Sequence, residues 1–155
     1  ILVSQETGSY VIRLEGDVRV VLSATLDDYM NTIFKSKDIS KIIIDMNETK
    51  GVDSTTLGLL AKLAIHSNAN FNIRPIVFCP DESLHETLLV MGLDDVFEII
   101  SKRKSELENL IELKSKPSHD AAIKQHVLEA HKLLSSINKK NKDEFLDLIA
   151  ALERE

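Results

Sequence analysis

The chain has 155 residues and a formal net charge of −6, with 19 Lys and Arg against 25 Asp and Glu. This excess of acidic residues argues against nucleic acid or an anionic membrane as partner, because both bind basic surfaces. Hydrophobic residues make up 43% of the sequence, enough for a buried core, but no apolar run is long enough to insert into a bilayer. The single cysteine, Cys79, cannot form an internal disulfide, so we expect a cytoplasmic protein.

The first hundred residues alternate between strand-like and helix-like patterns. Apolar and polar residues alternate on both sides of Gly8-Ser9, which predicts an antiparallel hairpin. The run Lys41–Met46 is almost continuously apolar, as in a central strand covered on both faces, and a loop over 47–52 follows it. Gly92 stands where a helix would end in a left-handed residue. We predict strands over 2–6, 10–15, 41–46, 73–79 and 96–100, and helices over 23–36, 53–70 and 81–91.

This order of elements predicts the fold class α/β. Each strand–helix–strand step should be a right-handed parallel crossover. The result is a mixed sheet of about five strands with helices packed against it.

The last third of the chain carries helical patterns only. Leu107, Leu110 and Ile111 follow the fifth strand directly and predict a closing helix that packs on the sheet. Further apolar stripes come after Pro117, with a polar break over 138–142 before a last short helix. We therefore expect a domain over 1–116, whose motif-bearing part is 1–101, and a helical C-terminal extension over 117–155.

The extension has an apolar stripe that something must cover: Ile123, Val127, Ala130, Leu134 and Ile137. It could fold back on the domain, pair with a second copy in a homodimer, or dock on a partner helix, and we favour the partner or subunit role. His131 lies beside this stripe without the glycine that follows the histidine of phosphotransfer helices. We predict an exposed helical histidine.

None of the usual catalytic or cofactor-binding patterns is complete. The five glycines are scattered, so the sequence contains neither the glycine pattern of a P-loop nor that of a dinucleotide-binding motif. Ser54 does not lie in a nucleophile elbow, and His85-Glu86 lacks the second histidine of a zinc-protease helix. We predict a protein that is not an enzyme and has no cofactor and no metal site.

The most informative segment runs from the third predicted strand into the second predicted helix. A buried strand ends in an aspartate, a short loop follows, and a helix then starts with Asp-Ser-Thr and Leu-Gly; these residues are Asp45, Asp53, Ser54, Thr55, Leu57 and Gly58. The pattern resembles the phosphorylation motif of STAS-domain proteins, specifically the bacterial anti-sigma factor antagonists. The resemblance extends over about residues 1–101 and includes the order of the elements.

The resemblance implies a site and a set of partners. In phosphorylatable members the serine after the loop aspartate accepts phosphate from a partner kinase, and here that serine is Ser54, with Thr55 and Thr56 as secondary candidates. The surroundings of the phosphosite, which would also bind the partner, are Asp45, Asp53, Thr55, Thr56, Leu57 and Gly58. The unphosphorylated protein would bind an anti-sigma factor, usually a serine kinase, and free the sigma factor. Phosphorylation would release it, and a PP2C-type phosphatase would restore it.

Each of these residues also has a purely structural interpretation. Asp53 or Ser54 can be an ordinary helix N-cap, Asp45 can cap its strand, and Gly58 can be a packing glycine. Thr55 and Thr56 can be solvated first-turn residues, although Thr56 also departs from the small residue that antagonists commonly carry there. The alternative function is that of a STAS-type regulatory subunit of a membrane transporter.

Overall fold

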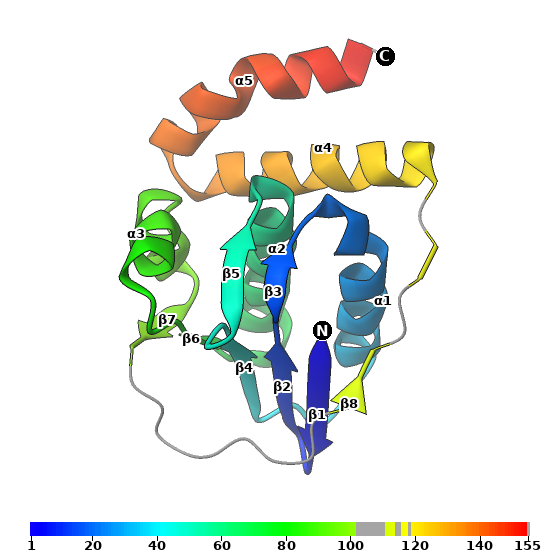
Figure 1. Cartoon of the computed structure of the whole chain (residues 1–155), viewed down its shortest axis with the longest axis vertical. Coiled ribbons are helices and arrows are strands. Elements are labelled where there is room, and N and C mark those ends of the chain that lie inside the picture. Colours follow the sequence, from blue (N-terminus) through cyan, green and yellow to red (C-terminus); the bar gives the residue numbers. More distant parts are fainter. Residues whose placement is uncertain (102–110, 114–115, 118, 155) are drawn as a thin grey trace.

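The computed structural model describes residues 1–101, 111–113, 116–117 and 119–154. Its main sheet has the strand order β7-β6-β4-β2-β1-β8 (Figure 1). The strands are β1 (Leu2–Glu6), β2 (Ser9–Arg13), β4 (Lys41–Asp45), β6 (Ile76–Phe78), β7 (Glu98–Ile100) and β8 (Ile111–Glu112). β1 pairs antiparallel with β2 and β8, and the other neighbours are parallel, so the predicted mixed sheet is confirmed.

The hairpin between β1 and β2 turns through Thr7 and Gly8. Their φ angles are 44° and 80°, so both central residues are left-handed, as a two-residue turn of type I′ requires. The backbone oxygen of Gly8 then accepts hydrogen bonds from the amides of Ser40 and Lys41, at 2.8 and 3.3 Å. The hairpin is thereby tied to the start of β4.

A second, two-stranded sheet continues beyond the first. It consists of β3 (Gly16–Val18) and β5 (Thr49–Val52), which run parallel. The sequence prediction of a loop over 47–52 is therefore wrong for its last four residues. The hydroxyl of Thr49 donates to the backbone oxygen of Leu14 at 2.7 Å, which joins this small sheet to the end of β2.

Three helices accompany the sheet: α1 (Ser23–Phe34), α2 (Ser54–Phe71) and α3 (Glu82–Val90). Helices α1 and α2 contact each other; in Figure 1, α2 lies behind the strands and α1 lies to the right of β1. Short 3₁₀ turns, η1 (Val20–Leu22) and η2 (Leu93–Asp95), precede α1 and follow α3. Gly92 has φ 75°, which confirms the left-handed helix stop.

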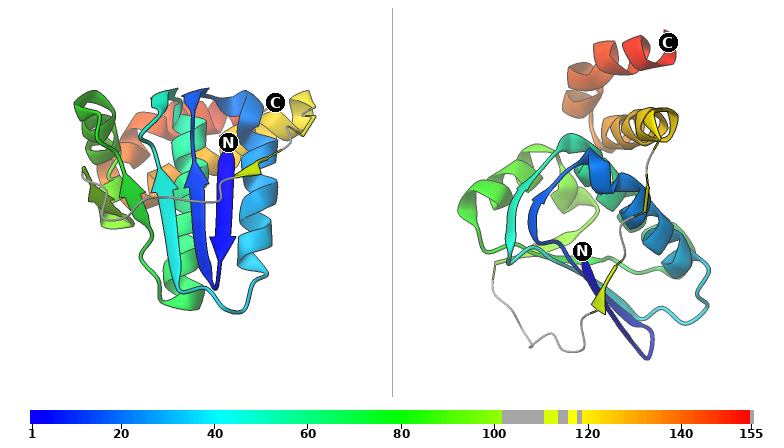
Figure 2. Two further views of the ribbon diagram at one scale, coloured as in Figure 1. Left: turned by 60° about the horizontal axis from the view of Figure 1, so that its bottom comes forward. Right: turned by 45° about the vertical axis from the view of Figure 1, so that its right-hand side comes forward.

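The C-terminal part differs from the sequence prediction in three ways. Ile111 lies in β8, an edge strand, and not in a closing helix; Leu107 and Leu110 lie outside the described residues. The polar break is shorter than expected, because α4 (Asp120–Ile137) is followed at once by α5 (Lys139–Arg154). Of the three arrangements considered for the extension, the structure shows it folded back on the domain and not the favoured partner or subunit role, since α4 packs along α2 and α1. Figure 2 shows α4 between the domain and α5.

The core is continuous with the extension. Leu134 of α4 is fully buried and belongs to the same apolar cluster as Leu26, Leu57 and Leu60. In the part of the chain that the structure describes, no helix is both long and apolar enough to cross a membrane.

Candidate functional site

The site is built around the first turn of α2, which begins directly after β5. Asp53 is the N-cap, and its Oδ1 accepts a hydrogen bond from the amide of Thr56 at 2.9 Å. Its Oδ2 accepts a second one, at 2.7 Å, from the amide of Val20 in η1. Of the two predicted cap candidates, the structure selects Asp53. The carboxylate also ties the start of α2 to the turn that leads into α1.

Ser54 is the first residue of α2 and is half-buried. Its Oγ lies 2.7 Å from Nε2 of His131, a residue of α4. Nδ1 of the same ring lies 2.6 Å from the backbone oxygen of Val127. Because a carbonyl oxygen can only accept, Nδ1 carries a ring proton, and in this tautomer Nε2 accepts from the Ser54 hydroxyl.

His131 itself is only 3% exposed, so the prediction of an exposed helical histidine is wrong. Its ring packs edge-on against Phe145 of α5, with 4.9 Å between the ring centroids. The ring is therefore held from three sides, by Ser54, by its own helix backbone and by α5.

Gly58 lies one turn further along α2, where α4 crosses closest. A Cβ built on Gly58 would lie 2.4 Å from the backbone oxygen of Ala130 and 2.5 Å from its Cβ. Real Cβ atoms essentially never make such contacts, so only glycine permits this crossing. The predicted packing glycine is confirmed, and the segment it accommodates is α4.

Polar contacts flank this crossing. Lys62 of α2 donates to Asp27 of α1 at 3.0 Å and pairs with Glu129 of α4 at 2.7 Å. Burial by itself lowers the pKa of Lys62, but the hydrogen bonds that its ammonium donates to the two carboxylates, together with their negative charges, outweigh it, and the net pKa is raised. His126 of α4 reaches Ser23, the first residue of α1, with 2.9 Å between Nδ1 and Oγ.

The two threonines after Ser54 point into the protein. Thr55 and Thr56 are 5% and 3% exposed, so the prediction of solvated first-turn residues is wrong. Oγ1 of Thr56 lies 2.8 Å from Oδ1 of Asp53 and 3.2 Å from the backbone oxygen of Val18. Leu57 belongs to the core. Of the three hydroxyl-bearing residues in this turn, Ser54 is the most exposed.

Asp45 forms an ion pair and caps the strand at the end of β4. The parallel register of β2 and β4 sets Arg13 opposite Asp45, and their Nε and Oδ2 atoms lie 2.8 Å apart. Oδ1 accepts from the amide of Asn47 at 3.0 Å, so Asp45 caps the strand as the structural interpretation expects. The Asp45 side chain is fully buried.

A hydroxyl that donates to a neutral imidazole is the first part of an activated nucleophile. Here α4 supplies the imidazole and also covers the hydroxyl. Among the described residues, no group of His, Cys, Asp and Glu is arranged to hold a metal ion.

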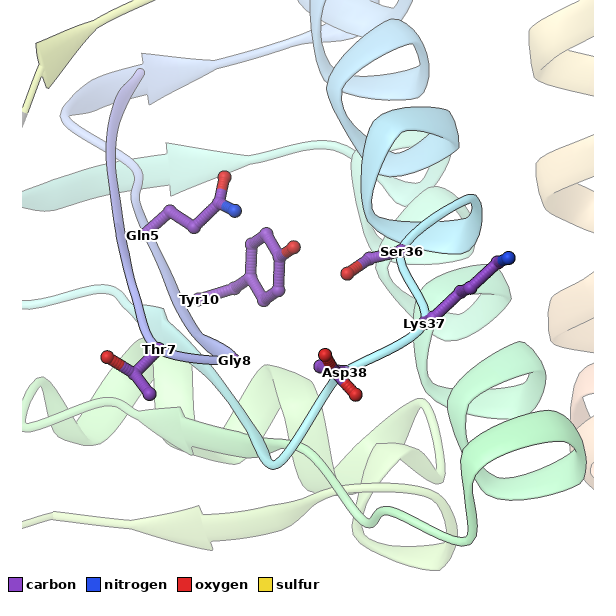
Figure 3. Close-up of a pocket in the computed structure, with 7 residues that line it drawn as sticks. All are labelled: Gln5, Thr7, Gly8, Tyr10, Ser36, Lys37 and Asp38. Atoms are coloured by element: carbon purple, nitrogen blue, oxygen red, sulfur yellow. The ribbon is translucent and has the colours of Figure 1, made fainter.

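An open pocket of about 440 Å³ lies at the opposite end of the sheet, at the hairpin turn (Figure 3). Tyr10, Ser36 and Asp38 are among its lining residues. It contains none of the predicted site residues, and Gly8 at its edge holds the hairpin against the chain before β4.

Sequence reasoning missed the part of the site that comes from α4, chiefly His131, Ala130 and Glu129. Two signals were available. A glycine at position 58 interrupts an otherwise strong helix, and Ala130 is the smallest residue of the α4 stripe. Small residues on two helices are what a close crossing needs, but a single sequence does not say that these two helices meet.

Comparisons with known proteins are consistent with this fold. Two structures of SpoIIAA are among the solved structures that are similar to this chain. The unphosphorylated form, an anti-sigma factor antagonist, has TM-score 0.55 and 16% identity over 67% of this chain and 89% of that one. The phosphorylated form of the Bacillus cell fate determinant has TM-score 0.53 and 19% identity over 64% and 89%.

Among curated protein sequences none is significantly similar. The STAS domain family, however, matches residues 1–106. The chain therefore belongs to the STAS-domain family.

Proposed function

We propose that this chain is an anti-sigma factor antagonist in a phosphorylation-controlled partner-switching pathway. Unphosphorylated, it binds an anti-sigma factor that is also a serine kinase and so frees a sigma factor. Phosphorylation of Ser54 by that kinase releases the complex, and a PP2C-type phosphatase reverses the modification. The structurally similar SpoIIAA is described as an anti-sigma factor antagonist and occurs in unphosphorylated and phosphorylated forms, which supports the proposal.

One observation carries the assignment to Ser54. The start of α2 is capped by Asp53, and the Ser54 hydroxyl bonds to another helix instead. Modification of Ser54 therefore leaves the cap of α2 in place. In contrast, Thr56 bonds to Asp53 and is buried, so phosphate on Thr56 would disrupt the helix start.

The position suits a phosphate. A phosphoserine carries about −1.5 to −2 charges at neutral pH, and the N-terminus of a helix stabilises an anion through its unpaired amides and its dipole. The domain should therefore remain folded after modification. A partner surface that fits a neutral hydroxyl beside Asp53 would meet a dianion instead and would lose affinity.

The experiment is phosphorylation of the full chain by candidate serine kinases of the anti-sigma class, with the modified residue located by mass spectrometry. Ser54→Ala should abolish the modification. Ser83→Ala is the matched control, because Asp81 caps α3 as Asp53 caps α2, and Ser83 lies exposed in its first turn.

Full phosphorylation of the Ser54→Ala variant, with phosphate on Thr55 or Thr56, would show that the assignment is wrong. Capture of a transport subunit in place of a kinase would favour the regulatory-subunit alternative.

A further inference from the structure

We propose that α4 occupies the surface through which the STAS domain meets its kinase, so that α4 must leave before the partner binds or Ser54 is phosphorylated. This inference rests on the proposed function. It also assigns a role to the C-terminal helices: α4 and α5, which belong to the same chain, compete with the partner for the surface around Ser54.

The strongest contact is made with the reactive atom itself. Nε2 of His131 lies 2.7 Å from Oγ of Ser54 and accepts a hydrogen bond from its hydroxyl. In phosphoryl transfer, the attacking oxygen must approach the γ-phosphorus in line with the leaving group. The imidazole, 97% buried between α2, α4 and α5, holds the position from which a base of the kinase would accept the proton of this hydroxyl. Transfer to Ser54 therefore requires His131 to move away.

The second contact covers the same surface one helical turn further along α2. α4 crosses α2 at Gly58 so closely that no Cβ would fit between Gly58 and Ala130. Ala130 is fully buried there. No partner segment can contact Gly58 while α4 is seated, so the partner and α4 exclude one another on this part of the surface.

Specific polar contacts hold α4 to the domain in addition to its packing on α2. Its two histidines, His126 and His131, reach the serines that begin α1 and α2, Ser23 and Ser54. Glu129 pairs with Lys62 between these two positions. The fully buried apolar residues of α4 are only Ala130 and Leu134, while its other stripe residues are partly exposed. Helices with so small a buried apolar face open more readily than core elements.

The test uses the full chain with one substitution on α4, so that the STAS domain keeps its sequence. Ala130→Glu introduces a carboxylate where α2 leaves no room, and should displace α4. Gln125→Glu is the matched control, since it adds the same charge on an exposed position of the same helix. His131→Ala is a milder second variant, which removes the bond to Ser54 without adding bulk.

Two readouts separate the inference from the proposed function. Amide hydrogen exchange of the first turn of α2, measured without any partner, should become about tenfold faster or more in Ala130→Glu and not in the control. With the kinase found by the Ser54 experiment above, the initial rate of phosphorylation should rise by a similar factor, because the rate follows the open fraction. His131→Ala should give an increase of the same sign.

The outcomes are distinct. Faster exchange with faster phosphorylation supports the inference. Equal phosphorylation rates in wild type and Ala130→Glu, despite faster exchange, overturn it while the proposed function stands. Slower phosphorylation of both variants would make α4 part of the recognised surface and also overturns it. Failure of every such kinase to modify either chain removes the proposed function, and the inference with it.

Discussion

The close crossing at Gly58 makes Gly58→Ala a sharp test of how α4 is seated. The added methyl carbon would lie 2.4 Å from the backbone oxygen of Ala130, whereas ordinary contacts begin near 3.4 Å, so α4 must move by about 1 Å. Two of the three nearest atoms belong to the Ala130 backbone, so no rotation of a side chain relieves the overlap. Overpacking of this kind costs about 1–3 kcal/mol.

That cost falls on the docking of α4, because the bond between Ser54 and His131 depends on the same crossing. The open fraction of α4 should rise by about tenfold to a hundredfold. Within α2 the same substitution is favourable, since alanine exceeds glycine in helix propensity by about 1 kcal/mol. The domain and the extension should therefore respond in opposite directions.

Hydrogen exchange followed by peptide mass spectrometry measures both effects in one sample. Peptides of α4 should exchange faster, and the centre of α2 should not. Asn70→Ala is the control, because it raises helix propensity in an exposed part of α2. Unchanged exchange in α4 would refute the close crossing. Equal acceleration across α2, α4 and the sheet would show instead that α4 unfolds only with the whole domain.

Three further predictions concern the domain itself. Asp53→Ala should lower the free energy of unfolding in urea by about 1–2 kcal/mol, more than Ser54→Ala, because Asp53 caps α2; equal losses would contradict that assignment. Arg13→Met removes the guanidinium that pairs with the buried Asp45 carboxylate and should cost about 3 kcal/mol in the same assay, whereas a loss below about 1 kcal/mol would contradict a tight pair. Burial raises the pKa of Cys79 from 9.0 to about 11, so alkylation of the native thiol at pH 8 should be about a hundredfold slower than that of a free thiol. The alkylation rate should increase with pH up to about pH 11, whereas a plateau near pH 9 would show an ordinary pKa.

The elements that sequence reasoning predicted correctly have signals within a few residues. Asp53 before the apolar period of α2 and Gly92 after that of α3 act through local hydrogen bonds and backbone angles, which any copy of these segments would share. The apolar run of β4 predicted this strand equally well, because a strand covered by the protein on both faces is uniformly apolar.

The elements that were missed depend on distant partners. β5 contains Lys50 and Gly51 and lacks any apolar alternation; it is a strand because β3 lies beside it. Ile111 fits a helical stripe in sequence, but it pairs with Val3 at the edge of the sheet. Pairing across more than a hundred residues leaves no trace in local periodicity.

The candidate site likewise has one part that the sequence predicted and another part that depends on distant residues. The turn with Asp53 and Ser54 was located because its chemistry is contiguous in the chain. His131 was misjudged because it stands one position beside the apolar stripe, where a polar residue is usually solvated. Its burial follows from the packing of α5 on α4, which no pattern within α4 encodes.

The pairing of β8 with β1 sets how strongly α4 competes with molecules in solution. β8 is anchored to the edge of the sheet, and only residues 113–119 separate its end from the start of α4. A short link of this kind gives the helix an effective concentration of the order of millimolar at its own docking surface. An intrinsic dissociation constant of about 0.1 mM would then suffice to keep the surface occupied roughly nine-tenths of the time. A competitor would see its apparent affinity reduced about tenfold, and lengthening residues 113–119 would lessen this reduction without altering any contact.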